Sequence, residues 1–245
     1  MEHPFVINFP KEQRQESASS EITEMRTLLS ELDHRYMMYE PSSYYYTAKR
    51  AMDITISLFF MALIMSWLLP IVALLIKITS KGPVFFKQKR TGYKGIEFDC
   101  FKFRTMYVNA DADIKQAVAD DKRITPIGRF LRITHIDEVP QFLNVLIGDM
   151  SIVGPRPHML YHTSYYAEHI PYYNLRHETP PGMTGMAQVK GYIGEINMTR
   201  ELRKRVQWDI YYLKHRSVWM DIKIIMTTFA HVALKMVGLQ PKRNA

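Results

Sequence analysis

An uncharged stretch of 23 residues, from Ile54 to Ile76, constrains the fold of this chain more than any other feature. Its polar residues are Thr55, Ser57 and Ser66. About 20 predominantly apolar residues suffice for a transmembrane helix, and the core helices of soluble proteins are usually shorter. The stretch therefore predicts a membrane-embedded helix, with a buried helix of a soluble protein as the alternative.

Two details favour a re-entrant helix over a simple span. Pro70 lies inside the stretch and removes a backbone donor, so we expect the helix to bend there. Basic residues flank both ends, namely Lys49, Arg50, Lys77, Lys81, Lys87, Lys89 and Arg90. The positive-inside rule assigns such flanks to the cytoplasm, so a helix that enters, breaks and returns satisfies both observations.

The charge of the chain is unevenly distributed around this stretch. The whole chain has a net charge of +8, but residues 1–45 hold four basic and eight acidic residues. The remainder is a basic body, which suggests nucleic acid, anionic lipid or phosphorylated substrates as partners. Cys100 is the only cysteine, which excludes an intrachain disulfide and favours a reducing compartment. No cleavable signal peptide is visible in residues 1–45.

The rest of the chain predicts a mixed α+β fold. Val84–Phe86 and Glu97–Phe101 have the character of short strands joined by a turn at Thr91–Gly95. Lys102 and Arg104 share a face if the second strand continues. The chain is expected to be helical from Glu201. The apolar segment 218–234 is interrupted by Asp221, Lys223 and His231, and therefore predicts an interfacial helix rather than a second span.

The segment from Arg132 to Asn144 concentrates groups that suit chemistry. Thr134 is a suitable N-cap, which would place Asp137 and Glu138 at the positive end of a helix, where a bound phosphate is also favoured. Arg132 could hold that phosphate, and an ionised Asp beside a pyrophosphate can attack phosphorus. An acidic pair at this position is also common as a simple helix cap.

A second candidate element is the loop in which Pro155 and Pro157 bracket Arg156. The prolines fix the backbone and present a guanidinium suited to bidentate phosphate binding, although such a loop also suits a purely structural corner. His158, His162, His169 and His177 follow, with tyrosines between them. Their spacing fits no common zinc site, so a surface or interfacial helix is the favoured interpretation.

Taken together, these motifs resemble the bacterial sugar transferase family, the monotopic phosphoglycosyl transferases. The matching segments, in order, are Lys49–Asp53, Gly82–Gly92, Phe101–Met106, Asp137–Ser151, Val153–Pro157 and Pro181–Val189. The long multi-span N-terminal domain of larger members has no counterpart here, so the chain resembles the compact form. Two positions differ from the usual pattern: Leu69 precedes Pro70 where a serine is frequent, and Lys190–Glu195 replaces a Gly-Arg-Asn continuation.

The resemblance implies an enzyme that moves a sugar 1-phosphate from a UDP-sugar to polyprenyl (undecaprenyl) phosphate. It implies release of UMP, a covalent aspartyl phospho-sugar intermediate, and a role at the start of polysaccharide or glycoprotein assembly. Two alternatives remain open: a membrane-anchored glycosyltransferase that releases UDP, and a non-catalytic membrane-bound adaptor. The absence of base-reading motifs argues against a nucleic-acid partner.

The resemblance also implies roles for individual residues. Asp137 resembles the nucleophile. Glu138 resembles its partner, which coordinates Mg²⁺ and could assist proton removal from the lipid phosphate. The groups expected to bind substrate phosphates are Arg132, Arg156, Lys102 and Arg90. Gln141 and Asp149 are expected to support the site, and Pro70 to kink the membrane helix.

The expected organisation has three parts. Residues 1–46 form a polar, partly disordered extension, within which Ile22–Met38 has the spacing of an amphipathic helix. Residues 47–80 form the re-entrant helix, and residues 81–245 form the catalytic domain with interfacial C-terminal helices. Membrane lipids are expected partners, and the expected location is the cytoplasmic (inner) membrane with the catalytic domain facing the cytoplasm. The oligomeric state stays open, with a homodimer as one option.

Overall fold

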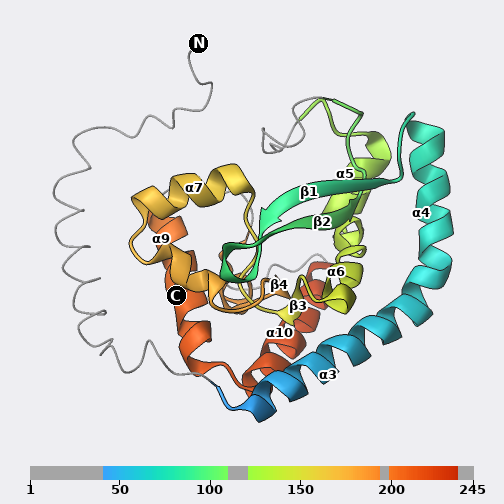
Figure 1. Ribbon diagram of the computed structural model, residues 1–245. Helices are drawn as coiled ribbons and strands as arrows, with labels where there is room; N and C mark the ends of the chain where they lie inside the picture. Colours follow the sequence, from blue (N-terminus) through green and yellow to red (C-terminus); the bar gives the residue numbers. More distant parts are fainter. Residues whose placement is uncertain (1–40, 110–120, 194–198, 237–245) are drawn as a thin grey trace. The chain divides into compact units, whose positions relative to one another are not determined.

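The computed structural model describes residues 41–109, 121–193 and 199–236, and the helix expected over Ile22–Met38 lies outside these ranges. The mixed α+β class is confirmed (Figure 1). The elements are α3 (Ser43–Phe60), α4 (Ser66–Thr79), β1 (Phe85–Thr91), β2 (Glu97–Phe103), α5 (Pro126–Ile133), α6 (Gln141–Ile147), β3 (Ser151–Val153), α7 (Leu160–His169), β4 (Gly182–Thr184), α8 (Met186–Val189), α9 (Thr199–His215) and α10 (Val218–Met236).

The apolar stretch lies in a continuous helix from Ser43 to Thr79, which is long and apolar enough to cross a membrane. A π-helical segment, Met61–Met65, joins α3 to α4, and the ribbon changes direction between these two helices (Figure 1). The departure from α geometry thus precedes Pro70, which lies inside α4 rather than at a break. Nearby side chains supply extra donors, because Ser66 Oγ donates to the Ala62 carbonyl at 2.7 Å.

Apolar side chains of this helix are largely exposed. The most exposed are Leu58, Phe59, Leu63, Trp67, Ile71, Leu74 and Ile78. An apolar surface of this kind is usually covered by another protein or by lipid. The helix is long enough to cross a membrane, which makes lipid a suitable environment for it. Helix α10 also exposes apolar side chains, including Trp219, Met226 and Phe229. The interfacial position expected for this helix stays a prediction.

The N-terminal part of the long helix is tied to the rest of the fold by buried polar contacts. Lys49 is only 5% exposed and forms an ion pair with Asp221 of α10 at 2.9 Å. Arg50 donates to the carbonyls of Val145 and Leu146, both at 2.6 Å, and so caps the C-terminal end of α6. The sequence identified both residues only as part of a basic flank of the apolar stretch, and the structure shows that they bond to other parts of the fold.

The predicted hairpin is confirmed, although its first strand runs over Phe85–Thr91 instead of Val84–Phe86. Strands β1 and β2 pair antiparallel, with Phe85 opposite Phe103 and Thr91 opposite Glu97. Helix α6 is fixed to β2 through Asn144, whose side chain accepts from Phe101 N at 2.9 Å and donates to Asp99 O at 2.7 Å. These bonds hold α6 against the hairpin.

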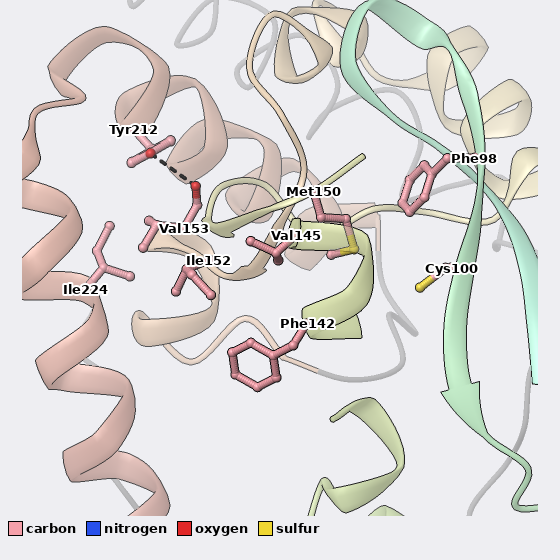
Figure 2. Packing of buried hydrophobic residues seen from close by; sticks show 9 residues of the cluster. All are labelled: Phe98, Cys100, Phe142, Val145, Met150, Ile152, Val153, Tyr212 and Ile224. Carbon is pink, nitrogen blue, oxygen red and sulfur yellow. Dashed lines mark hydrogen bonds between the residues drawn. The ribbon is translucent and has the colours of Figure 1, made fainter. Parts of the chain in front are cut away.

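A second sheet consists of two short parallel strands, β3 and β4, neither of which was predicted as a strand. Gly154 and Gly182 allow the two backbones to approach, because a Cβ on Gly154 would lie 2.3 Å from Pro180 O. The main apolar core joins these strands to the hairpin, α6, α9 and α10 (Figure 2). Its buried members are Phe98, Cys100, Phe142, Val145, Met150, Ile152, Val153, Tyr212 and Ile224.

Candidate active site

A cavity of about 550 Å³ lies between the hairpin, the end of α5 and the loop before α7. All six of the predicted catalytic and phosphate-binding residues line it: Asp137, Glu138, Arg132, Arg156, Lys102 and Arg90. They come from four separate segments of the chain. The cavity therefore gathers two carboxyl groups and four basic side chains in one place.

The acidic pair lies in a tight turn rather than in the first turn of a long helix. Thr134 was predicted as an N-cap, but it is the C-cap of α5, and Thr125 supplies the N-cap of that helix through its bond to Gly128 N. His135 then adopts a left-handed conformation with φ 59°, and a 3₁₀ turn follows over Ile136–Glu138. The reversal after α5 directs the acidic pair into the cavity.

Glu138 is held by two cations. Lys102 Nζ lies 2.7 Å from Glu138 Oε1, and Arg156 binds the carboxylate through both terminal nitrogens, with Nη1 3.0 Å from Oε2. Burial alone would favour the protonated acid. The charges of Arg156 and Lys102 outweigh it and hold the pKa of Glu138 well below its ordinary value. Glu138 is therefore a permanent anion that fixes two basic side chains.

Asp137 has a different environment, although it is adjacent. It is 8% exposed, and burial together with the negative charge of Glu138 raises its pKa to about 6. The more distant charges of Lys102, Arg132 and Arg156 limit that rise. At neutral pH, Asp137 is thus mostly ionised but poorly solvated, which suits a nucleophile or a base.

The remaining predicted phosphate ligands differ in how they are held. Arg132 Nε donates to Thr105 Oγ1 at 2.8 Å, which orients its guanidinium beside Asp137. Arg90 instead donates to Pro157 O and to Gln88 Oε1, both at 2.6 Å. The described contacts of Arg90 are therefore those of a residue that positions the loop around Arg156.

That loop is fixed at four consecutive carbonyl groups. The carbonyls of residues 155–158 accept, in order, from Gly182 N at 2.9 Å, Arg176 Nη2 at 2.8 Å, Arg90 Nη1 at 2.6 Å and Thr91 N at 3.1 Å. Arg176 is itself buried and paired with Asp209 at 2.8 Å. The loop was predicted to be rigid because of its prolines, and these donors from three other segments add to that rigidity.

The two residues expected to support the site do not line the cavity. Gln141 is buried at the start of α6. Asp149 Oδ2 accepts from Asn144 Nδ2 at 3.3 Å, next to the link between α6 and β2. Both therefore lie in the scaffold behind the acidic pair.

Several residues that line or support the cavity were not predicted as site residues. Thr105 and His135 line it, and Arg176 holds the Arg156 loop. His158 lines it too, although the sequence analysis considered this residue only as a zinc ligand and rejected that interpretation. Its position two residues after Arg156 could have indicated that it belongs to the site. Ile193, in the segment that replaces the Gly-Arg-Asn continuation, also contributes to the lining.

The donor set of the site is compatible with Mg²⁺. No group of three or more His, Cys, Asp or Glu side chains suited to a metal occurs among residues 41–109, 121–193 and 199–236. Mg²⁺ commonly takes only one or two protein carboxylates and completes its shell with water and substrate phosphates. Asp137 and Glu138 supply such oxygen donors, although both oxygens of Glu138 also contact cations.

Comparison with known proteins places this geometry in context. The family model described as bacterial sugar transferase matches residues 44–235. The chain is 45% identical to the UDP-glucose:undecaprenyl-phosphate glucose-1-phosphate transferase of Klebsiella pneumoniae over 74% of the chain and 39% of that protein. It is also 45% identical to the protein of the same name from Caulobacter vibrioides, over 74% of the chain and 67% of that protein.

A relative named for a different sugar is similar as well. The UDP-N-acetylgalactosamine-undecaprenyl-phosphate N-acetylgalactosaminephosphotransferase of Aeromonas hydrophila is 40% identical over 77% of the chain and 44% of that protein. The chain thus spans about two fifths of the length of several curated relatives that it matches. Similarity of this extent shows the family to which the chain belongs. The sugar named differs between relatives, being glucose in one case and N-acetylgalactosamine in another.

Proposed function

Because the chain belongs to the bacterial sugar transferase family, we propose that it transfers a sugar 1-phosphate from a UDP-sugar to undecaprenyl phosphate and releases UMP. The observation that carries the proposal is the contrast between two adjacent carboxyl groups in one cavity. The pKa of Asp137 is raised to about 6, whereas Glu138 is kept ionised by Arg156 and Lys102. Such a divergence separates a reactive group from a supporting one.

The proposed reaction has two displacements at phosphorus. A carboxylate oxygen of Asp137 attacks the phosphorus that carries the sugar, and the bond from that phosphorus to the bridging oxygen breaks, so UMP leaves with the bonding electrons. A phosphate oxygen of undecaprenyl phosphate then attacks the aspartyl phospho-sugar, and the bond to Asp137 breaks. The products are the lipid diphosphate sugar and the original carboxylate.

The basic side chains of the cavity support this chemistry electrostatically. Arg156 is a bidentate donor fixed by its loop, and Lys102 and Arg132 add positive charge where a pyrophosphate would lie. When bound, Mg²⁺ would neutralise pyrophosphate charge, held by Asp137 and Glu138. Because its pKa is so low, Glu138 is a poor proton acceptor, and its proposed role is to hold ligands rather than to act as a base.

Identification of the released nucleotide tests the proposal directly. Purified full-length protein would be incubated with undecaprenyl phosphate, Mg²⁺ and a panel of UDP-sugars. Release of UMP, dependent on Mg²⁺ and abolished by a chelator, is expected. UDP instead would support a glycosyltransferase that moves only the sugar. Release of neither nucleotide across the panel would favour a non-catalytic membrane-bound adaptor.

The covalent step has its own test. Asp137→Asn removes the attacking carboxylate, so transfer should fall on the order of 10³-fold or more. Asp99→Asn is the matched control, because Asp99 forms an exposed ion pair with Lys89 outside the cavity. Retention of activity in Asp137→Asn would contradict the nucleophile assignment. Trapping of radioactive sugar phosphate on the wild type, but not on Asp137→Asn, would support it.

A further inference from the structure

The cavity has a second region that the proposed chemistry leaves unassigned. His158 lines it together with His162, Tyr166 and Arg205. The residue before a proline is restricted to extended conformations, and alternate residues of an extended chain are about 7 Å apart and face the same side. A group that lies beyond the unit attached to a phosphate at Arg156 would therefore come within reach of His158.

The hydrogen bonds of His158 determine which of its nitrogens carries the proton. Arg176 Nη1 lies 2.9 Å from His158 Nδ1, and the Tyr173 hydroxyl lies 2.5 Å from the same atom. A guanidinium can only donate, so Nδ1 accepts and the hydrogen resides on Nε2. Burial and the nearby charge of Arg176 lower the pKa of His158 well below its ordinary value, so the ring is neutral.

The resulting Nε2–H donor has no hydrogen-bond partner among the residues that the structure describes, although His158 is 7% exposed. An unpaired buried donor is costly, so it marks a position where a ligand acceptor would be stabilising. Aromatic rings surround it: Tyr166 meets the His158 ring edge-on at 5.5 Å, and His162 is tilted against Tyr166 at 5.5 Å.

We propose that His158 Nε2–H donates a hydrogen bond to a ring carbonyl oxygen of the uracil base of the nucleotide donor. Tyr166 and His162 would form the aromatic wall beside that base. This inference rests on the proposed function, because it takes a UDP-sugar as the ligand. A planar base with carbonyl acceptors matches an aromatic wall that has a hydrogen-bond donor at its edge. His158 is thus a specificity-determining residue.

Two substitutions separate base recognition from the structural role of the ring. In His158→Asn, the side-chain oxygen can still accept from Arg176, but nothing reaches the position of Nε2. In His158→Gln, the longer amide can bring an N–H near that position. His169→Asn is the matched control, since His169 is exposed on α7 and does not line the cavity.

Binding of UMP, CMP, ribose 5-phosphate and glucose 1-phosphate would be measured by calorimetry on full-length protein in nanodiscs. For the wild type, UMP should bind more tightly than ribose 5-phosphate. His158→Asn should weaken UMP binding about tenfold, the worth of one hydrogen bond, and leave ribose 5-phosphate unchanged. His158→Gln should recover part of that loss. UMP and CMP share the 2-carbonyl, but CMP has an amino group in place of the 4-carbonyl. Equal binding of the two nucleotides would therefore indicate a bond to the 2-carbonyl, and weaker binding of CMP a bond to the 4-carbonyl.

The outcomes that overturn the inference are distinct. Equal weakening of UMP and ribose 5-phosphate in His158→Asn would mean that the ring acts only through Arg176 and the loop. Unchanged UMP affinity would exclude the contact while leaving the proposed function intact. Weakened glucose 1-phosphate with unchanged UMP would assign the contact to the sugar. Failure of the wild type to bind UMP would contradict the proposed function and the inference together.

Discussion

Two neighbouring carboxyl groups can have opposite electrostatic environments because a tight turn directs their side chains differently. Glu138 meets Arg156 and Lys102 at hydrogen-bonding distance, so its charge is compensated. Asp137 is buried but meets its basic neighbours only at longer range, so desolvation dominates. Two measurable consequences follow for Asp137, one for the reaction rate and one for stability.

The pH dependence of transfer should report the ionisation of Asp137. Only the carboxylate can attack phosphorus, so kcat/KM should rise with pH through an apparent pKa near 6 and reach a plateau above about pH 7. An ordinary Asp would already be ionised at pH 5. Initial rates from pH 5 to 8 at several Mg²⁺ concentrations would test this, because a metal ion held by Asp137 would lower the apparent pKa as the site becomes saturated. A flat profile would mean that Asp137 is not the group that limits the rate.

The stability of the protein should increase when Asp137 is made neutral. Its folded-state pKa of about 6 exceeds the unfolded value, so the folded state binds the proton more tightly. Stability is therefore lost as pH rises from about 4 to 6, and the penalty persists above that window at roughly 2–3 kcal/mol. Thermal unfolding of Asp137→Asn at pH 7.5 and pH 4.5 should show stabilisation at the higher pH and less at the lower. A destabilised variant at pH 7.5 would contradict the assigned environment.

At the scale of elements, the site depends on how separate segments are joined. The Arg156 loop receives donors from the hairpin, from β4 and from Arg176. Helix α3 receives comparable anchoring, because Lys49 also donates to Val153 O at 2.8 Å. The buried pair of Lys49 and Asp221 thus joins the membrane helix to β3 and α10 near the start of that loop.

Breaking this buried pair should be strongly destabilising. Lys49→Met leaves Asp221 charged and unpaired at 0% exposure, with an expected cost of roughly 3–5 kcal/mol. Denaturant unfolding in detergent would measure it. Lys77→Met is the control, since Lys77 is exposed at the other end of the long helix and should change stability by less than about 0.5 kcal/mol.

A second substitution distinguishes charge burial from lost packing in this region. The double variant Lys49→Met with Asp221→Leu removes both charges together, so it should recover most of the loss. Equal losses in the single and double variants would show instead that the hydrogen bonds from Lys49 to Val153 and Tyr212 hold the helix.

At the scale of the whole molecule, the exposed apolar surface of the long helix governs how the protein meets a membrane. The helix is 37 residues long and only 17% of its most apolar window is buried. Its two ends, Ser43 and Thr79, are either on the same side of the membrane or on opposite sides. The bend between α3 and α4 favours the same side (Figure 1).

Cysteine labelling would distinguish these two topologies. In a Cys100→Ser background, Tyr44→Cys and Lys81→Cys each place one thiol at an end of the helix. A membrane-impermeant reagent applied to intact spheroplasts of a bacterial host should label neither, and lysis should expose both. Labelling of one position before lysis would show a spanning helix and contradict the re-entrant prediction.

The sequence alone determined those features that depend on local composition and covalent constraint. The apolar run from Ile54 to Ile76 had to be a buried or embedded helix, because 23 uncharged residues cannot remain in water. The hairpin was predicted from two short strand-like segments and the glycine-containing turn between them. The acidic pair and the proline-bracketed Arg156 could be selected because their residue types already carry the chemistry.

Only the tertiary structure decided which distant residues meet. The sequence indicated a basic flank at Lys49 and Arg50 and a phosphate ligand at Arg90. In the structure, each of these side chains bonds to a group far along the chain. The bend precedes Pro70, and the donor on His158 is defined by Arg176, which lies 18 residues away. The physical reason is that a hydrogen bond depends on where folding brings two groups together, and the packing of the core sets that position.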